Sequence, residues 1–424
     1  MLLGESRLVG TLKKAAKASP ADETLLAAQR SAQTTLRFSG GRIYQNFHEE
    51  DLTVWIKVAC EGRIGVATTS SLRHEPLLAA IQAAIGIARL SLPVPAHPAG
   101  GRQAGGKQAA PSFSTSDTQE PAPKVETYFP ATVQRPLTET VDTIRRLWAR
   151  FHKRRMDLAG SFVAGESELA VVGSRGLLRY QPLTVGALRL VATEGKASGF
   201  AAQAFRDIRE LKPEAMAQRA QEFCRLNRDP RPITLGRYDV LLEPEAVAEL
   251  VEWLSYIGFG AKQFDERTSF LTGRMGDPLM HPRMTIYDDG ADPRGLAMPF
   301  DFEGVPKRRV DLIQQGKAAG VVYDSAYARL HHTRSTGHAP AYDEHEGPLA
   351  LNLFLTAGDA PRQDLLRRME RGLWVTRFHY VNGLLNTQEG LMTGLTRDGT
   401  FLVKRGKVAG AVKNLRFTES ILEA

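Results

Sequence analysis

The sequence contains few of the residues that bind zinc or form disulfide bonds. Only two cysteines, Cys60 and Cys224, occur among 424 residues, and no histidine lies between His152 and His281. Two isolated cysteines provide no disulfide framework. These cysteines and histidines also do not form the pattern of a closed zinc site with nitrogen and sulfur ligands.

The sequence also lacks a long apolar segment. No apolar run approaches the roughly 20 residues that span a bilayer, and the opening residues, MLLGESR, contain no apolar core of a signal peptide. We therefore expect a cytoplasmic protein without membrane contact. With 42% hydrophobic residues, the 424-residue chain is long enough for two or three cores. Its net charge of +8 permits, without requiring, an acidic or nucleic-acid partner.

A segment over residues 93–136 interrupts every periodic pattern. It contains eight prolines and two glycine pairs, a composition that buries too little apolar surface to offset the entropy lost on ordering. We predict a mobile linker or long surface loop here. It separates an N-terminal α/β domain, residues 1–92, from a central α+β domain, residues 137–235. A strand-rich C-terminal domain follows over residues 236–424.

Short strands and tight turns dominate the C-terminal part. Asp288-Asp289-Gly290, Asp398-Gly399 and Arg405-Gly406 predict hairpin turns, because such residues adopt the backbone angles of two-residue loops. No repeat of solenoid type occurs. The whole chain therefore fits the α+β class.

A strand that leads into an amphipathic helix is predicted in the second half of the chain. Val240–Leu242 form a short apolar run, and Pro244 suits a first helical turn because its missing N–H would be unpaired there anyway. Apolar residues then recur on one helix face, and Glu245, Glu249 and Glu252 share another. The glutamates fit a solvated face near a helix N-terminus, where the dipole favours negative charge. Catalysis by Glu245 is the alternative.

Several phrases of the sequence resemble the TldD/PmbA family of metallopeptidases. They lie at Ser269–Gly273, Ile286–Gly290, Phe300–Pro306, Ser335–Ala339, Val375–Asn382, Thr396–Phe401 and Val412–Ser420. The resemblance covers nearly the whole chain outside the linker and is most specific in the C-terminal phrases. It implies a PmbA/TldD-like fold, in which an N-terminal α/β unit precedes strand-rich middle and C-terminal domains with large mixed or antiparallel sheets.

In this family, a zinc-bearing subunit carries His-Glu-x-x-x-His and pairs with a related PmbA or TldE-type subunit that lacks it. The motif needs two imidazoles one turn apart and a glutamate as general base. Aligned on Glu-Ala-Val, the glutamate falls on Glu245, and the histidines fall on Pro244 and Glu249. Cys60 and Cys224 both precede the helix, whereas zinc-bearing members use a cysteine after it. The resemblance thus implies a subunit with no cofactor of its own and zinc in its partner.

One tract is rich in histidine, with His331, His332, His338 and His345 close together. Imidazole and neighbouring carboxylates could bind a transition metal, but no standard zinc spacing occurs, and glycines and prolines mark a solvated loop. In the resembled family this stretch lines a central cavity. The resemblance therefore implies substrate contacts by His338, His345 and Asn352.

Basic residues between 145 and 155 are the best nucleic-acid feature: Arg145, Arg146, Arg150, Lys153, Arg154 and Arg155. Leu147, Trp148 and Phe151 form an apolar stripe between them, which favours an amphipathic helix with a solvated basic face. The sequence contains neither a phosphate-binding loop nor a Gly-x-Ser-x-Gly elbow. Nucleotide hydrolysis and serine catalysis therefore find no support.

Three functions stay open at this point. The first is a non-catalytic subunit that pairs with a zinc-bearing paralogue and helps to hold unfolded or modified peptides. The second is a stand-alone peptidase or hydrolase that uses Glu245 as general base and a metal held by carboxylates and the histidine loop. The third is a nucleic-acid-binding protein. The missing ligands favour the first. The peptide, the pathway and the choice between homodimer and heterodimer stay open.

Overall fold

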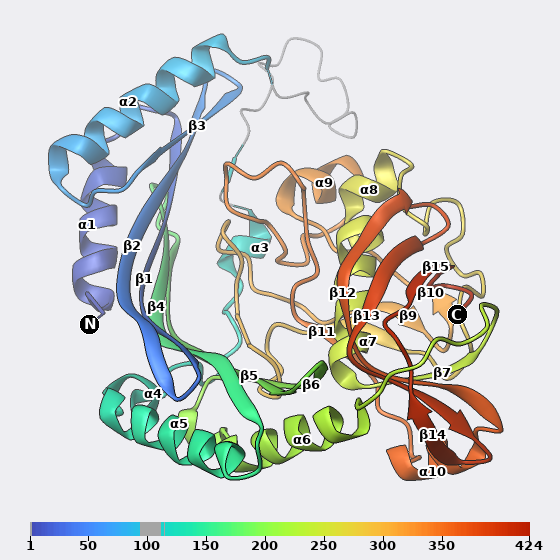
Figure 1. The fold of residues 1–424 in the computed structure, drawn as a ribbon. Coiled ribbons are helices and arrows are strands. Elements are labelled where there is room, and N and C mark those ends of the chain that lie inside the picture. The colour runs from blue at the N-terminus through green and yellow to red at the C-terminus, as the bar shows by residue number, and fades with distance from the viewer. Residues whose placement is uncertain (1, 94–111, 114) are drawn as a thin grey trace.

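The computed structural model describes residues 2–93, 112–113 and 115–424. Residues 94–111, which make up much of the predicted linker, lie outside the described part. Two regions stand side by side in Figure 1: a long sheet with its helices, and a C-terminal region built from two further sheets. The predicted α+β class with large antiparallel sheets is confirmed.

The first sheet combines strands from both sides of the predicted linker. Its order is β3-β2-β1-β4-β5-β6, and every neighbouring pair is antiparallel. The strands are β1 (Glu23–Ser39), β2 (Arg42–Cys60), β3 (Arg63–Thr69), β4 (Asp157–Gly173), β5 (Leu178–Glu194) and β6 (Ala197–Phe205). The ranges 1–92 and 137–235 therefore each supply three strands to one sheet, because β1 and β4 pair along 14 residue positions.

Alternation along the strands places helices on one face of this sheet. Leu26 and Leu36 of β1 point to the same face; Leu26 packs with two helices near one end and Leu36 with two others near the far end. The first two helices are α1 (Glu5–Ala18) and α2 (His74–Leu90), and the other two are α5 (Leu137–His152) and α6 (Pro213–Leu226). The opposite face, with Leu25 and Trp55, packs against Phe300 of the C-terminal region. The sheet thus forms the wall on which that region rests.

The described part of the predicted linker is ordered by polar contacts, contrary to expectation. It contains α3 (Ser116–Gln119) and α4 (Pro130–Gln134). Asp117 and Glu120 form ion pairs with Arg308 and Arg334 of the C-terminal region. Arg179 of β5 donates to the carbonyls of Thr118, at 2.8 Å, and Glu120. The low apolar content did not predict this order, because the anchoring comes from these charged groups together with Phe113, which is buried in the core with Trp55 and Phe300.

The C-terminal region contains two smaller sheets. One has the order β10-β9-β8-β11 and the other β14-β13-β12-β7, with β15 paired to β13. Their strands are β7 (Asp239–Leu242), β8 (Ile286–Asp288), β9 (Val310–Gln314), β10 (Lys317–Ala318), β11 (Leu353–Leu355), β12 (Arg371–Asn386), β13 (Leu391–Lys404), β14 (Lys407–Ala411) and β15 (Arg416–Ser420). Its helical elements are α7 (Pro244–Leu254), the π-helical turn η2 (Ser255–Phe259), α8 (Ala261–Asp265), α9 (Ser325–Leu330) and α10 (Arg362–Arg368).

One of the three predicted hairpin turns is confirmed and two are wrong. Asp288–Gly290 lies at the end of β8, but the next strand, β9, begins only at Val310, so these residues close no hairpin. Arg405-Gly406 connects β13 to β14. Asp398-Gly399 instead lies inside β13, where the pairing with β12 skips a position. The positive φ of 56° at Asp398 suits such a bulge as well as it suits a turn. The bulge turns the buried Asp398 carboxylate toward Ser198 and Arg377.

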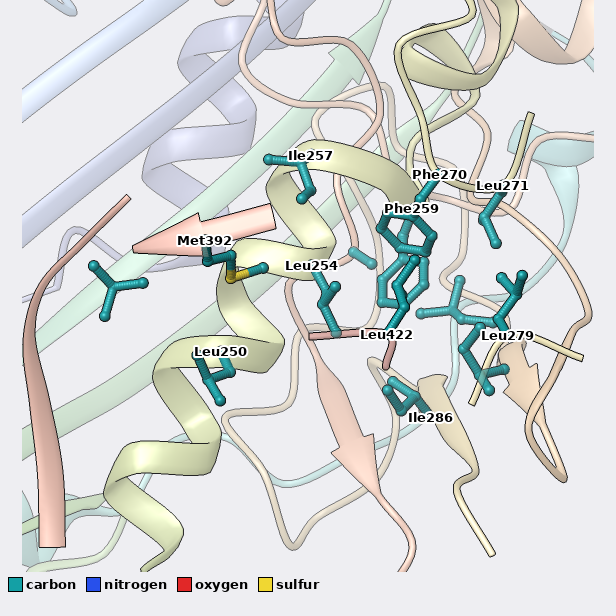
Figure 2. Packing of buried hydrophobic residues seen from close by; sticks show 14 of the residues in the cluster. Leu250, Leu254, Ile257, Phe259, Phe270, Leu271, Leu279, Ile286, Met392 and Leu422 are labelled. Carbon is teal, nitrogen blue, oxygen red and sulfur yellow. The ribbon is translucent and has the colours of Figure 1, made fainter. Parts of the chain in front are cut away.

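The largest hydrophobic core lies between α7 and the C-terminal sheets. Figure 2 shows Leu250, Leu254 and Ile257 among its buried side chains, together with Phe259 of η2 and Met392 of β13. Within the described residues, no helix combines the length and apolar character required to cross a bilayer.

Candidate functional site on helix α7

The strand-to-helix unit predicted at Val240–Leu242 and Pro244 is confirmed. β7 pairs in parallel with β12, and α7 begins at Pro244. Leu250 and Leu254 lie on the buried face of α7, which fixes the rotation of the helix. This rotation directs the Glu245 side chain toward α6, the helix that covers the far end of the large sheet.

Arg219 of α6 binds two carboxylates at the start of α7. Its Nη2 atom donates to Glu243 Oε2 and to Glu245 Oε2, each at 2.8 Å. The Glu243 side chain is 6% exposed and that of Glu245 is 18% exposed, whereas that of Arg219 is 32% exposed. The face predicted to be solvated is therefore partly buried at Glu245. The reason is that Arg219 offsets the charge there.

Glu243 is the best-connected carboxylate of the site. Besides Arg219, it accepts a hydrogen bond from Trp374 Nε1 at 2.8 Å and one from Arg362 Nη1 at 3.2 Å. The guanidinium of Arg362 also lies over the Trp374 ring, 5.2 Å from its centroid. Three donors from three different elements thus converge on one buried carboxylate, which ties α6, α10 and β12 to the start of α7.

Glu249 lies one turn after Glu245 in a different environment. Burial raises the pKa of Glu249, and the nearby charge of Glu252 raises it further, while Arg377 opposes both. Arg377 is itself bound to Asp398 and lies over the Phe200 ring of β6, 4.1 Å from its centroid. Glu249 therefore faces the joint between the large sheet and the C-terminal region.

These residues do not fit a zinc ion. Zinc is bound by imidazole, thiolate or carboxylate in tetrahedral geometry, and no cluster of three such side chains with that capacity occurs in the described parts of the chain. Glu245 is bound by a guanidinium, whose positive charge repels a cation. Pro244, at the other ligand position of the family motif, has no donor atom in its side chain.

The predicted cavity residues fall in two places. His338 and Asn352 meet at Asp288: His338 Nε2 donates to Asp288 Oδ1 at 2.8 Å, and the backbone N–H of Asn352 donates to Oδ2 at 2.6 Å. His345 is exposed, and its carbonyl accepts a hydrogen bond from Lys262. The ring of His338 has 0% exposure. Its contact with a substrate would require movement of the loop, and that role stays a prediction.

The His338 site is a buried polar cluster. Burial lowers the pKa of His338, and the positive charge of Lys307 lowers it further. Burial alone would raise the pKa of Asp288, but its bonds to His338 and Asn352 and the charge of Lys307 outweigh it, so that this pKa lies below its ordinary value. A neutral imidazole beside an ionised carboxylate follows from these directions.

The predicted basic helix is also confirmed. Leu147 and Phe151 of α5 are buried in the core beneath the large sheet, and Trp148 packs against the same core. The arginines beside them lie on the outer surface, except that Arg154 reaches Gln221 of α6.

Arg219, Trp374 and Asp398 were not predicted as members of the α7 site. Their positions in the sequence carry no motif, and only the fold brings them together.

The architecture and the site define a class: an α+β protein whose strand–helix unit holds Pro244 and Glu249 at the two positions where the resembled metallopeptidase motif has its zinc-binding histidines. Residues 235–424 match the PmbA/TldA metallopeptidase C-terminal domain, and residues 26–88 match the PmbA/TldA metallopeptidase domain 1. The chain belongs to the PmbA/TldD family.

Individual relatives agree with this assignment. The metalloprotease TldD homolog of Haemophilus influenzae is 28% identical over 161 residues, 37% of this chain and 33% of that protein. The TldD homolog of Buchnera aphidicola from Acyrthosiphon pisum is 25% identical over 221 residues, 51% of this chain and 44% of that protein. The matched regions thus span less than half the length of these relatives. The crystal structure of TldE from Thermococcus kodakarensis has the same fold, with a TM-score of 0.80, 20% identity and coverage of 95% of this chain and 89% of that one.

Proposed function

We propose that this chain is the TldE/PmbA-type subunit of a TldD-type metallopeptidase complex. In this proposal it contributes no zinc site, and a paralogue with His-Glu-x-x-x-His supplies both the metal and the catalytic glutamate. The complex acts in proteolysis or processing of unfolded or modified peptides, and a cytoplasmic location is part of the proposal. A homodimer is the alternative assembly.

The ion pair between Glu245 and Arg219 carries this proposal. In a zinc peptidase, the motif glutamate acts as general base toward a metal-bound water. Here the glutamate in that position accepts a hydrogen bond from a guanidinium at 2.8 Å. The guanidinium occupies one oxygen of this carboxylate and disfavours a cation beside it. Glu245 thus serves as a structural contact between α6 and α7.

Support for pairing with a TldD-type paralogue comes from similarity to proteins of this family. The fold is that of a protein named TldE, and sequence similarity connects the chain to proteins named TldD homologs. The motif positions hold Pro244 and Glu249, yet the C-terminal sheets of the family are present. These sheets would then serve in packing and in docking to a partner. A partner surface is therefore expected.

Co-expression with a paralogue that carries His-Glu-x-x-x-His tests the proposal. Stable interfaces bury about 1,200–2,000 Å² in total, and obligate ones bury more, so the pair should stay together through gel filtration. Peptidase activity should appear with the complex and be absent from this chain alone. Turnover by the purified chain alone, at the rate of the mixture, would assign catalysis to this chain and overturn the proposal.

A further inference from the structure

A half-enclosed cavity of about 230 Å³ lies among α5, the start of α6 and strands β4 and β5, close to the helix η1 (Ile208–Glu210). These helices cover the end of the large sheet that lies far from α1 and α2 (Figure 1). Core voids in proteins seldom exceed the size of one water molecule. At about 30 Å³ for each water-sized group, this cavity accepts about seven or eight non-hydrogen atoms.

The floor of the cavity is apolar. It is formed by buried side chains of the core beneath the sheet: Ile144, Leu147, Phe162, Leu188 and Ile208. Leu211, which is half-buried, closes one side. Such a surface binds hydrocarbon or aromatic groups and gives a fully polar ligand no hydrogen-bond partner at its base.

The rim of the cavity carries a positive charge. Arg135 and Arg146 line it, together with Thr140, Thr143 and one carboxylate, that of Glu214. Arg146 Nη2 donates to the Thr143 hydroxyl at 3.1 Å, which holds the guanidinium at the edge of the cavity. Arg135 forms a long ion pair with Glu139, at 3.5 Å. Arg146 forms no ion pair within the described residues, so its guanidinium is the positive group at the rim that a ligand can reach.

We propose that this cavity binds a small apolar carboxylate, with the hydrocarbon or aromatic part on the floor and the carboxylate at Arg146 and Arg135. Guanidinium groups bind carboxylates through short, charge-assisted hydrogen bonds, and the position of Arg146 beside Thr143 places such donors at the mouth. The ligand comes from one of two sources with the same chemistry: a free short-chain acid, or the C-terminal residue of a peptide. The inference does not depend on the proposed subunit role.

Calorimetry with defined probes tests this site on the full-length chain. Hexanoate has the size of the cavity, and hexanol is its uncharged counterpart. We expect hexanoate to bind at least about tenfold more tightly than hexanol, because only hexanoate forms the charge-assisted contact. N-acetyl-leucine and its amide form the second pair. Tighter binding of the acetylated residue than of hexanoate assigns the peptide C-terminus as the source, and the reverse assigns the free acid.

Variants locate the binding. Arg146→Gln should weaken hexanoate about tenfold and leave hexanol unchanged. Arg145→Gln is the matched control, since Arg145 is the next residue on α5, is exposed, pairs with Asp142 and lies outside the cavity lining. Leu211→Trp should block both probes, and circular dichroism checks that this variant is folded. The proposal is overturned when hexanol binds as tightly as hexanoate, when neither binds at millimolar concentration, or when the Arg145 variant loses as much affinity as the Arg146 variant.

Discussion

Replacing Arg219 by methionine removes the group that holds two carboxylates at the start of α7. Arg219 Nη2 donates to Glu243 and Glu245, at 2.8 Å each. A hydrogen bond to a charged group contributes about 1.5–3 kcal/mol when buried, but the Arg219 side chain is 32% exposed, so solvent screening reduces each to roughly 1 kcal/mol. Glu243 keeps its two other donors, and Glu245 gains water. We expect the free energy of unfolding to fall by about 2 kcal/mol.

Urea denaturation of the purified chain, followed by tryptophan fluorescence, measures this loss. Arg219→Lys should lie between wild type and Arg219→Met, because lysine keeps the charge without the planar fork that reaches both carboxylates. Arg367→Met is the control: its side chain is 71% exposed and pairs with Asp364 within one helix, so the expected change is below about 0.5 kcal/mol. A loss for Arg219→Met no larger than that of the control would refute this account of the site.

Three further predictions concern pH, metal and nucleic acid. Burial lowers the pKa of His338, so this residue binds a proton more readily in the unfolded chain than in the folded one. The free energy of unfolding should therefore fall as the pH drops below about 6.5, by up to about 1.4 kcal/mol per pH unit. His338→Asn should reduce that fall in denaturation measured from pH 5 to 8. Metal analysis after mild dialysis should find no stoichiometric zinc, and about one zinc per chain, lost on mutating His338 or His345, would contradict this. DNA and RNA should show no submicromolar binding with a steep salt dependence, and replacing Arg150 and Arg154 should leave the weak binding that remains unchanged.

The sequence was sufficient to predict elements whose pattern is local. Periodic apolar residues and Pro244 predicted α7 and its buried face, and the stripe of Leu147 and Phe151 predicted α5. The dipeptide Arg405-Gly406 predicted a hairpin. Each of these depends on residues a few positions apart, where propensity and periodicity act directly.

Features that depend on distant pairing could not be predicted in this way. Nothing in the sequence indicates that β1 pairs with β4 across the proline-rich segment, or that Asp117 is fixed by Arg334, 217 residues away. Arg219 belongs to no sequence motif, and from the sequence alone it is indistinguishable from a solvated charge on a helix. The dipeptide Asp398-Gly399 suits a turn and a bulge equally, and the pairing of β13 with β12 on both sides of it makes it a bulge.

The most direct test of the central claim is peptidase turnover by the co-purified complex when Glu245 of this chain is replaced by glutamine. We predict turnover within about twofold of wild type, because Glu245 has no metal-bound water to activate. Replacing the zinc-site glutamate of the paralogue should lower turnover by at least about a hundredfold, the usual contribution of a general base. Loss of turnover from Glu245→Gln, with the complex still intact on gel filtration, would show that this chain is catalytic and contradict the account.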